Sequence, residues 1–427
     1  MRAIGVRQLA ATIFNYTIGS GIFALPATVA AQLGTTAPLA YLLCAVVMML
    51  VAASFAEAGS RVSASGGPYA YVEAAFGPFL GLVAGVLLVV TAVTGVAVVT
   101  TLFAGSALAL AKVPATATPQ AAITIVVSVV VGVLNIRGVR SGVQMVEVMT
   151  AAKLLPLIAF VVVGAAFVDH ANLTWTAPPD STAVIATSGV LIFAFMGIES
   201  ALAPSGEVRE PSRTVPRATF LALLCVCALY LCVQTVAQGI LGPALGTTRI
   251  TPLAEAAGSA IGEPGRTIML LGASVSMLGF LFGAGLTNPR IVFAMARDGF
   301  LPRRIAAVHP VYRTPHCAIA LCILSSTAMA LSGTFERLLI ISNSSGMLVY
   351  MMVALAAIRL RRRAVRADGE PLVVPGGPAV HVLAFAAIGS MFTAIVSRED
   401  LLGLVVLLAA TALVYALSAP RRFARDS

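Results

Sequence analysis

Charged residues are scarce in this chain of 427 residues, because Asp, Glu, Lys and Arg together make up 10% of it. A soluble domain carries roughly 25% of such residues, and a water-facing surface cannot be built from so few. Apolar residues account for 59% of the chain. These two figures exclude a soluble enzyme, a secreted disulfide scaffold and a disordered polymer, and they predict an integral membrane protein.

Residues that commonly bind metals are also few, with 6 Cys and 4 His. The cysteines all lie in apolar segments, and none pairs with a second Cys or a His in a loop at metal-ligand spacing. The histidines fall at or beyond the ends of these segments and form no cluster. We therefore expect no metal site and no cofactor. The net charge of +10 is interpreted as membrane topology, not as nucleic-acid binding.

Apolar runs long enough to cross a membrane recur along the whole chain. Crossing about 30 Å of hydrocarbon takes roughly 20 residues. Such runs lie near residues 9–32, 36–60, 79–111, 119–136, 143–168, 182–204, 217–242, 265–296, 316–332, 338–360, 381–397 and 399–418. The sequence thus predicts an all-α integral membrane protein with about twelve transmembrane helices, the last two separated only by Ser397–Asp400.

The positive residues indicate how these helices are oriented. With the N-terminus in the cytoplasm, the outer loops contain only Lys112, Arg249, Arg266, Arg337 and Arg398. Except for Lys153, which lies within a span, all the other Lys and Arg residues then fall on the inner side. This asymmetry predicts a multi-pass protein of the cell membrane with both termini in the cytoplasm.

Two of the apolar runs are interrupted at corresponding places. The first is broken at Ile18-Gly19-Ser20-Gly21-Ile22 and the sixth at Met196-Gly197-Ile198-Glu199. Each begins a unit of five spans, and because five is odd the two units must be inverted relative to each other. The predicted organisation is a first repeat at 1–168, an inverted second repeat at 182–360, two additional helices at 381–418 and a cytoplasmic tail at 419–427.

Small residues also let membrane helices pack closely, so either interruption alone has a packing explanation. Paired interruptions in matching positions of inverted halves instead indicate a substrate site at the membrane midplane. We therefore expect discontinuous helices in spans one and six, with the site between them.

Four stretches of the chain together resemble the amino acid-polyamine-organocation permeases. They are Gly19–Phe23 with Leu25-Pro26, Ser65–Tyr71 with Phe76-Gly77, Phe195–Glu199 with Glu207–Pro211 and Val215–Ala218, and Ala296–Pro302. The resemblance implies five-plus-five inverted repeats with two added helices, and transport of amino acids by alternating access.

The resemblance also places the α-amino acid core of the substrate at the two interruptions. The implied substrate-binding residues are Ile18, Gly19, Ser20, Gly21, Ile22, Phe193, Phe195, Met196, Gly197 and Ile198. A half-helix that begins after the Ser20-Gly21 break would point N–H groups at the substrate carboxylate, and unwound carbonyls would accept from its ammonium. Phe193 and Phe195 are candidates for closing over the substrate, with an ordinary core role as the alternative.

Two charges are predicted to lie within the membrane. Lys153 is about ten residues into its span, or about 15 Å deep, and an unpaired lysine there costs roughly 2.5–3.5 kcal/mol. In relatives that run without sodium, a lysine in this span takes the place of the ion; Ser274, Ser276 and carbonyls around Gly19 are candidate acceptors. Lys153 is either a proton carrier or a fixed strut.

Glu199 is the second buried charge. It is interpreted as a brace between spans one and six, with substrate binding or proton relay as alternatives. Glu57 and Glu147 lie near cytoplasmic ends of spans, where we expect them to anchor loops.

The sequence therefore predicts a sodium-independent secondary transporter. We expect its substrates to be neutral amino acids, because Glu199 is the only mid-span carboxylate that could receive a cationic side chain. Proton symport and exchange of one amino acid for another both remain open. The alternative is a transport-inactive receptor or partner subunit that keeps the permease fold. An intramembrane enzyme is not supported, because no paired carboxylates or Ser-His pair occur at depth.

Overall fold

The computed structural model describes residues 5–62, 67–138, 143–175, 178–197, 211–248, 251–366 and 370–426. Within these ranges the side chains of 15–16, 143–152, 211–212 and 419–426 are left aside. Helices and their connections make up all of the described part, and no strand occurs in it.

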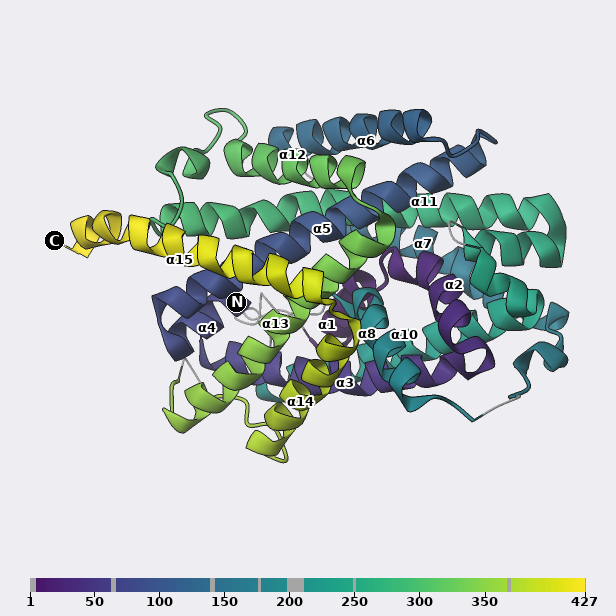
Figure 1. Cartoon of the computed structure of the whole chain (residues 1–427), viewed down its shortest axis with the longest axis horizontal. Helices are drawn as coiled ribbons and strands as arrows, with labels where there is room; N and C mark the ends of the chain where they lie inside the picture. The colour runs from purple at the N-terminus through teal and green to yellow at the C-terminus, as the bar shows by residue number, and fades with distance from the viewer. Residues whose placement is uncertain are drawn as a thin grey trace.

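The helices follow one another through the whole chain (Figure 1). The first repeat expected from the sequence contains α1 (Val6–Thr17), α2 (Gly21–Leu33), α3 (Ala37–Arg61), α4 (Pro68–Phe76), α5 (Pro78–Leu110), α6 (Ala117–Arg137) and α7 (Val143–Gly164). The remainder contains α8 (Ser181–Phe195), α10 (Pro211–Leu241), α11 (Pro252–Arg297), α12 (His316–Ser332), α13 (Phe335–Arg362), α14 (Pro378–Ile395) and α15 (Arg398–Asp426).

Many of these helices can cross a bilayer on their own. In the described part of the chain, 8 helical stretches are long and apolar enough to do so, with α2 and α3 counted as one stretch of 41 residues. Three further apolar helices are shorter, at Lys153–Phe167, Ser181–Phe195 and His316–Ser332. The chain is thus a multi-pass membrane protein.

The lipid-facing surfaces are apolar, as this environment requires. In α15, Leu402 and Val406 are 67% and 68% exposed, and Val126 in α6 is 63% exposed. Such side chains would be costly to leave in water, whereas hydrocarbon accepts them without penalty. Figure 1 shows α15 extending away from the rest of the molecule toward the C-terminus.

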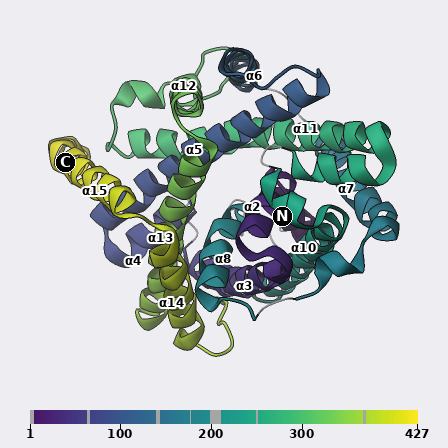
Figure 2. The ribbon, with the colours of Figure 1, turned by 45° about the vertical axis from the view of Figure 1, so that its right-hand side comes forward.

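The packing divides most helices into two groups (Figures 1 and 2). The first group contains α1, α2, α3, α8 and α10. In it, α1 packs on α10, α10 packs on α3, and both α2 and α3 pack on α8. In the other, α5, α6, α11 and α12 pack together. Helix α7 packs on α11, and α13 packs on α5 as well as on α3 and α14.

These contacts are reciprocal between the two halves of the chain. The contact of α1 with α10 has its counterpart in that of α8 with α3. In the same way, the contact of α7 with α11 matches that of α13 with α5. In each case, exchanging the first half for the second converts one contact into the other.

Helix α11 begins earlier than the apolar run near 265–296 indicates. Its first nine residues form a separate helix, because Ile261 and Gly262 have non-helical dihedral angles and Gly262 has a φ of +74°. An ion pair connects the two parts, since Arg266 Nε and Nη2 both donate to Glu255 Oε1, at 3.1 and 2.9 Å. Charged residues thus form this turn, which hydropathy does not reveal.

Helices α14 and α15 are separated by the short turn that the sequence indicates. Ser397 caps α15 in a reciprocal arrangement with Asp400: the Asp400 N–H donates to Ser397 Oγ at 3.2 Å, and the Ser397 N–H donates to Asp400 Oδ2 at 3.0 Å. Helix α15 continues to Asp426, through the stretch expected as a tail.

Candidate functional site: two interrupted helices

The polypeptide is non-helical between α1 and α2. Helix α1 ends at Thr17, and Ile18 has dihedral angles of −77° and 86°, outside the helical region. Helix α2 begins at Gly21 with Ser20 as its N-cap residue. Glycine and serine favour such a break because glycine loses the most backbone entropy in a helix and serine competes with the ladder for hydrogen bonds.

The chain also leaves the helix after Phe195, at the end of α8. Met196 is extended, with dihedral angles of −64° and 155°, and Gly197 has a φ of +111°. That positive φ is strained for any residue with a Cβ, so glycine suits this position. The expected site residue Ile198 and the expected brace Glu199 lie outside the described residues.

The two interruptions lie against each other. A Cβ placed on Gly21 would be 2.7 Å from the Cα of Ala194, so only glycine permits this approach of α2 to α8. The start of α2 therefore meets the end of α8. The positive dipole end of α2 and the negative dipole end of α8 lie close together as a result.

Tyr230 of α10 joins the two interrupted helices. Its hydroxyl donates to the carbonyl oxygen of Ala194 at 2.9 Å and lies 3.2 Å from that of Thr17. Tyr230 is fully buried, and its ring packs edge-on against Phe195 with centroids 5.3 Å apart. The sequence analysis missed this residue. The available signal was a tyrosine in mid-span, whose hydroxyl needs a partner when it is buried.

Lys153 of α7 reaches the first interruption. Its Nζ donates to the Ile18 carbonyl oxygen at 2.9 Å, and the residue is 8% exposed. Ser276 of α11 donates its hydroxyl to the neighbouring Gly19 carbonyl at 3.5 Å. One ammonium thus lies at the unwound segment, where α7 and α11 both approach the carbonyls between α1 and α2.

Other expected polar residues are buried nearby without a partner in the described part of the chain. The hydroxyls of Ser20 and Ser274 make no hydrogen bond to it. Because a buried hydroxyl without a partner is costly, these two groups are positioned for a ligand or a water molecule.

The two expected aromatic residues have different environments. Phe195 is fully buried against Tyr230, as a core side chain is. Phe193 is half-buried, and its ring edge lies 4.0 Å from a Cβ placed on Gly95 of α5. Phe280 of α11, which sequence reasoning missed, lies 3.8 Å from a Cβ placed on Gly19.

Small residues line the region beside Phe193. Ser342 of α13 donates its hydroxyl to the Thr91 carbonyl at 3.2 Å, and its Oγ is 3.5 Å from a Cβ placed on Gly95. Gly346, one turn further along α13, allows Met196 to approach, since a Cβ there would overlap the Met196 methyl group. Helices α5 and α13 thus come close to the end of α8.

The interruption between α1 and α2 is buried, with Ile18 1% and Ser20 2% exposed. One small cavity lies between α5, α11 and α12 and is lined in part by Asn288 and Ser326. Another is lined by Phe23 of α2, Ser106 of α5 and residues of α11 that include Met277. Neither of these two cavities is lined by Ile18–Gly21. The described residues contain no group of three or more His, Cys, Asp or Glu that could hold a metal.

Comparison with known proteins identifies the family. The family model described as amino acid permease matches residues 4–416, which is nearly the whole chain. The chain belongs to the amino acid permease family. Its members are transporters, not enzymes, and this family accounts for a chain of apolar helices.

Several relatives of this permease cover most of its length. An uncharacterized transporter of Mycobacterium tuberculosis is 33% identical over 361 residues, 83% of this chain and 79% of the relative. The serine/threonine exchanger SteT of Bacillus subtilis is 29% identical over 92% of this chain and 90% of its own. The branched-chain amino acid permease BcaP of the same organism is 24% identical, covering 88% and 85%.

Proposed function

We propose that this permease is a secondary transporter that carries neutral amino acids across the cell membrane by alternating access, without sodium. The observation that carries the proposal is the meeting of the two interrupted helices at Gly21 and Ala194 under the hydroxyl of Tyr230. Two relatives are named for neutral amino acids, serine/threonine and branched-chain, whereas a third, of Arabidopsis thaliana and 29% identical, is named a cationic amino acid transporter. The neutral class therefore rests on the scarcity of mid-span carboxylates in the sequence.

The start of α2 is suited to the substrate carboxylate. The first turn of a helix has N–H groups without intrahelical partners, and its dipole contributes up to about 2 kcal/mol to anion binding when partly buried. The Phe23 N–H already donates to Ser20 O at 3.1 Å. The N–H groups of Gly21 and Ile22 are therefore the donors assigned to the carboxylate, with the Ser20 hydroxyl beside them.

The substrate ammonium has fewer unoccupied acceptors than the sequence suggests. Ile18 O accepts from Lys153, and Gly19 O accepts from Ser276. The carbonyls of Phe195 and Met196, at the negative end of α8, are the remaining members of the expected set. A carbonyl oxygen has two lone pairs, so Ile18 and Gly19 can still contribute a second bond.

Lys153 is assigned the role of a sodium ion. Its ammonium donates to the unwound carbonyl of Ile18. The next carbonyl, that of Gly19, accepts from Ser276 of α11. A fixed charge at this point holds α7 against the interruption without a metal. Lys153 either keeps its proton throughout the cycle as a fixed strut or releases it as a proton carrier. Exchange and proton symport differ in whether the empty carrier can reorient.

The reciprocal contacts between the halves support inverted repeats at 1–168 and 182–360, with α14 and α15 as the added pair. Inversion places the two interruptions at the same depth, and the resulting symmetry provides two exchangeable conformations. The distribution of Lys and Arg supports a topology with both termini in the cytoplasm.

The experiment is uptake of labelled amino acids by proteoliposomes, measured with and without internal amino acid at two external pH values. Uptake that needs internal amino acid identifies an exchanger, whereas uptake that rises with external acidity identifies a proton symporter. Neutral amino acids should compete with the label and arginine should not. If none of the twenty amino acids is transported, the chain is a transport-inactive member that retains the permease fold.

A further inference from the structure

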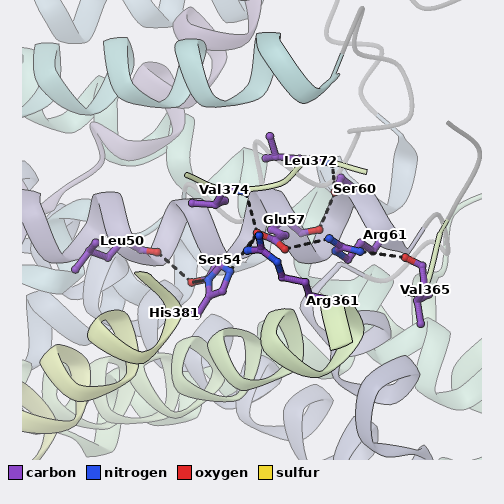
Figure 3. Close-up of polar contacts among 10 residues, drawn as sticks. All are labelled: Leu50, Ser54, Glu57, Ser60, Arg61, Arg361, Val365, Leu372, Val374 and His381. Atoms are coloured by element: carbon purple, nitrogen blue, oxygen red, sulfur yellow. Dashed lines mark hydrogen bonds and ion pairs between the residues drawn. The ribbon is translucent and has the colours of Figure 1, made fainter. Parts of the chain in front are cut away.

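A buried cluster of charged residues lies at the end of α3 that leads to α4 (Figure 3). Glu57 is fully buried, and its Oε1 lies 3.2 Å from Nη2 of Arg61 on the same helix. Its Oε2 lies 3.2 Å from Nε2 of His381 on α14 and 3.5 Å from Nη1 of Arg361 on α13. One carboxylate therefore contacts side chains of three helices.

The same carboxylate anchors the connection between α13 and α14. The Val374 N–H donates to Glu57 Oε2 at 3.0 Å, and the Leu372 N–H donates to the Ser60 hydroxyl at 2.9 Å. Arg61 donates to the Val365 carbonyl at 3.4 Å. The expectation that Glu57 anchors a loop is thus confirmed, but the loop is one that lies more than three hundred residues later in the sequence.

His381 closes the cluster from the side of α14. It is fully buried, and both ring nitrogens have partners, because Nδ1 lies 2.9 Å from the Ser54 hydroxyl and Nε2 lies beside Glu57. Ser54, Glu57 and Arg61 are spaced three and four residues apart, so they form one polar stripe on α3. Figure 3 shows α13 and α14 crossing beside this stripe.

The location of the cluster connects it to the interrupted helices. Helix α3 packs on α8 and α10, and at its other end, about 25 Å from Glu57 at 1.5 Å per residue, its Ala40 carbonyl accepts from the Ser188 hydroxyl of α8 at 3.1 Å. Helix α13 packs on α5 in the other group of helices. The cluster therefore joins α3, which belongs to the group with the interrupted helices, to α13, which also contacts α5 of the other group.

We propose that Glu57 is a positioning residue for transport: it fastens α13 and α14 to α3 and thereby sets the balance between the inward-facing and outward-facing conformations. This inference rests on the proposed function. A helix pair joined by a buried ion pair resists separation, because leaving either charge buried alone is strongly unfavourable. Conformations that keep the end of α3 beside Arg361 and His381 are favoured, and those that part them are not.

The test is Glu57→Gln, which keeps the size of the side chain and removes its charge. Half-saturation concentrations are measured at each face of the membrane in proteoliposomes of one orientation. The apparent affinity at a face scales with the fraction of the competent conformation, so the two values should move in opposite directions. We expect their ratio to change about fivefold or more.

A matched control separates positioning from charge removal in general. Glu399 of α15 also pairs with an arginine, at 2.9 Å from Arg337, but its side chain is 78% exposed. Glu399→Gln should leave both half-saturation concentrations unchanged. A merely structural role for Glu57 would lower the maximal rate of Glu57→Gln without moving their ratio, and that result would overturn the inference.

A milder variant keeps the test decisive if Glu57→Gln does not fold. Ser54→Ala removes the partner of His381 Nδ1 and a hydrogen bond within α3 to the Leu50 carbonyl, and it should shift the ratio in the same sense by a smaller factor. An unchanged ratio in folded Ser54→Ala, and in Glu57→Gln where it folds, overturns the inference while the wild type still transports. Absence of transport by the wild type would instead overturn the proposed function and this inference with it.

Discussion

Tyr230 of α10 donates its hydroxyl to the carbonyl oxygen of Ala194, 2.9 Å away in the last turn of α8, and the same hydroxyl is 3.2 Å from the Thr17 carbonyl at the end of α1. A single buried group thus connects the interrupted helices of both halves. Any motion that separates α1 from α8 has to break or redirect this interaction.

Tyr230→Phe tests that connection. The variant keeps the ring contact with Phe195 and removes the hydroxyl, which leaves two buried carbonyls without this donor at a cost of about 1–3 kcal/mol. We expect the half-saturation concentration for transport to rise roughly tenfold, as about 1.4 kcal/mol requires. The control is Tyr41→Phe, whose ring packs edge-on against Tyr230 but whose hydroxyl donates to the Gln234 side chain at 3.1 Å and not to a carbonyl of α1 or α8. Equal effects of the two variants would contradict a specific role for Tyr230.

Gly21 tests the contact between the interruptions themselves. In Gly21→Ala the new Cβ would lie 2.7 Å from the Cα of Ala194, and backbone on both sides has to move apart. We expect loss of most transport activity in protein that still reaches the membrane. Gly283→Ala on α11 is the matched control, because a Cβ there meets nothing within 4 Å and alanine favours a helix. Transport by Gly21→Ala at the wild-type rate would disprove close packing as a requirement.

Lys153→Ala removes the ammonium that bonds the Ile18 carbonyl. We expect transport to fall at least tenfold, since a charged hydrogen bond contributes about 1.5–3 kcal/mol and the unwound segment loses its donor. If Lys153 is the proton carrier, the residual transport should also lose its dependence on external pH. Lys112→Ala, an exposed residue, is the control. Unchanged uptake and an unchanged pH profile in Lys153→Ala would end the coupling hypothesis.

The two aromatic residues of α8 should respond differently to truncation. Phe195→Ala removes a fully buried ring and should lower the free energy of unfolding by about 3–5 kcal/mol. Phe193→Ala removes a half-buried ring and should instead raise the half-saturation concentration with little change in thermal stability. Thermal unfolding and transport measured on both variants decide this. A stability loss in Phe193→Ala as large as that in Phe195→Ala would assign Phe193 to the core.

The sequence locates the interruptions and the lone membrane lysine because these features are local. Glycine and serine break a helix wherever it lies, and a charge stands out in an apolar run. Even the partner of Lys153 was nearly located, since carbonyls around Gly19 were expected and Ile18 is the acceptor. Ser274 and Ser276 were also expected as acceptors for Lys153. Instead, Ser276 donates to the Gly19 carbonyl, and Ser274 makes no hydrogen bond among the described residues.

The interactions that sequence reasoning missed are those between distant segments. Tyr230 gives no charge signal, and its two acceptors lie on α1 and α8. In the sequence His381 stands at the end of a span and has no evident partner. In the structure it lies on α14 beside Glu57 of α3. The early start of α11 was also missed, because the turn at Gly262 depends on a backbone conformation and on the pairing of Glu255 with Arg266.

The most direct test of the central claim is sodium-free counterflow. Proteoliposomes are loaded with a neutral amino acid, diluted into sodium-free buffer that contains the labelled compound, and followed for accumulation of label. We predict transient accumulation in the wild type, the same in the presence of sodium, and much less in Gly21→Ala. No accumulation of any neutral amino acid above that of empty liposomes, or accumulation that requires sodium, would contradict the account.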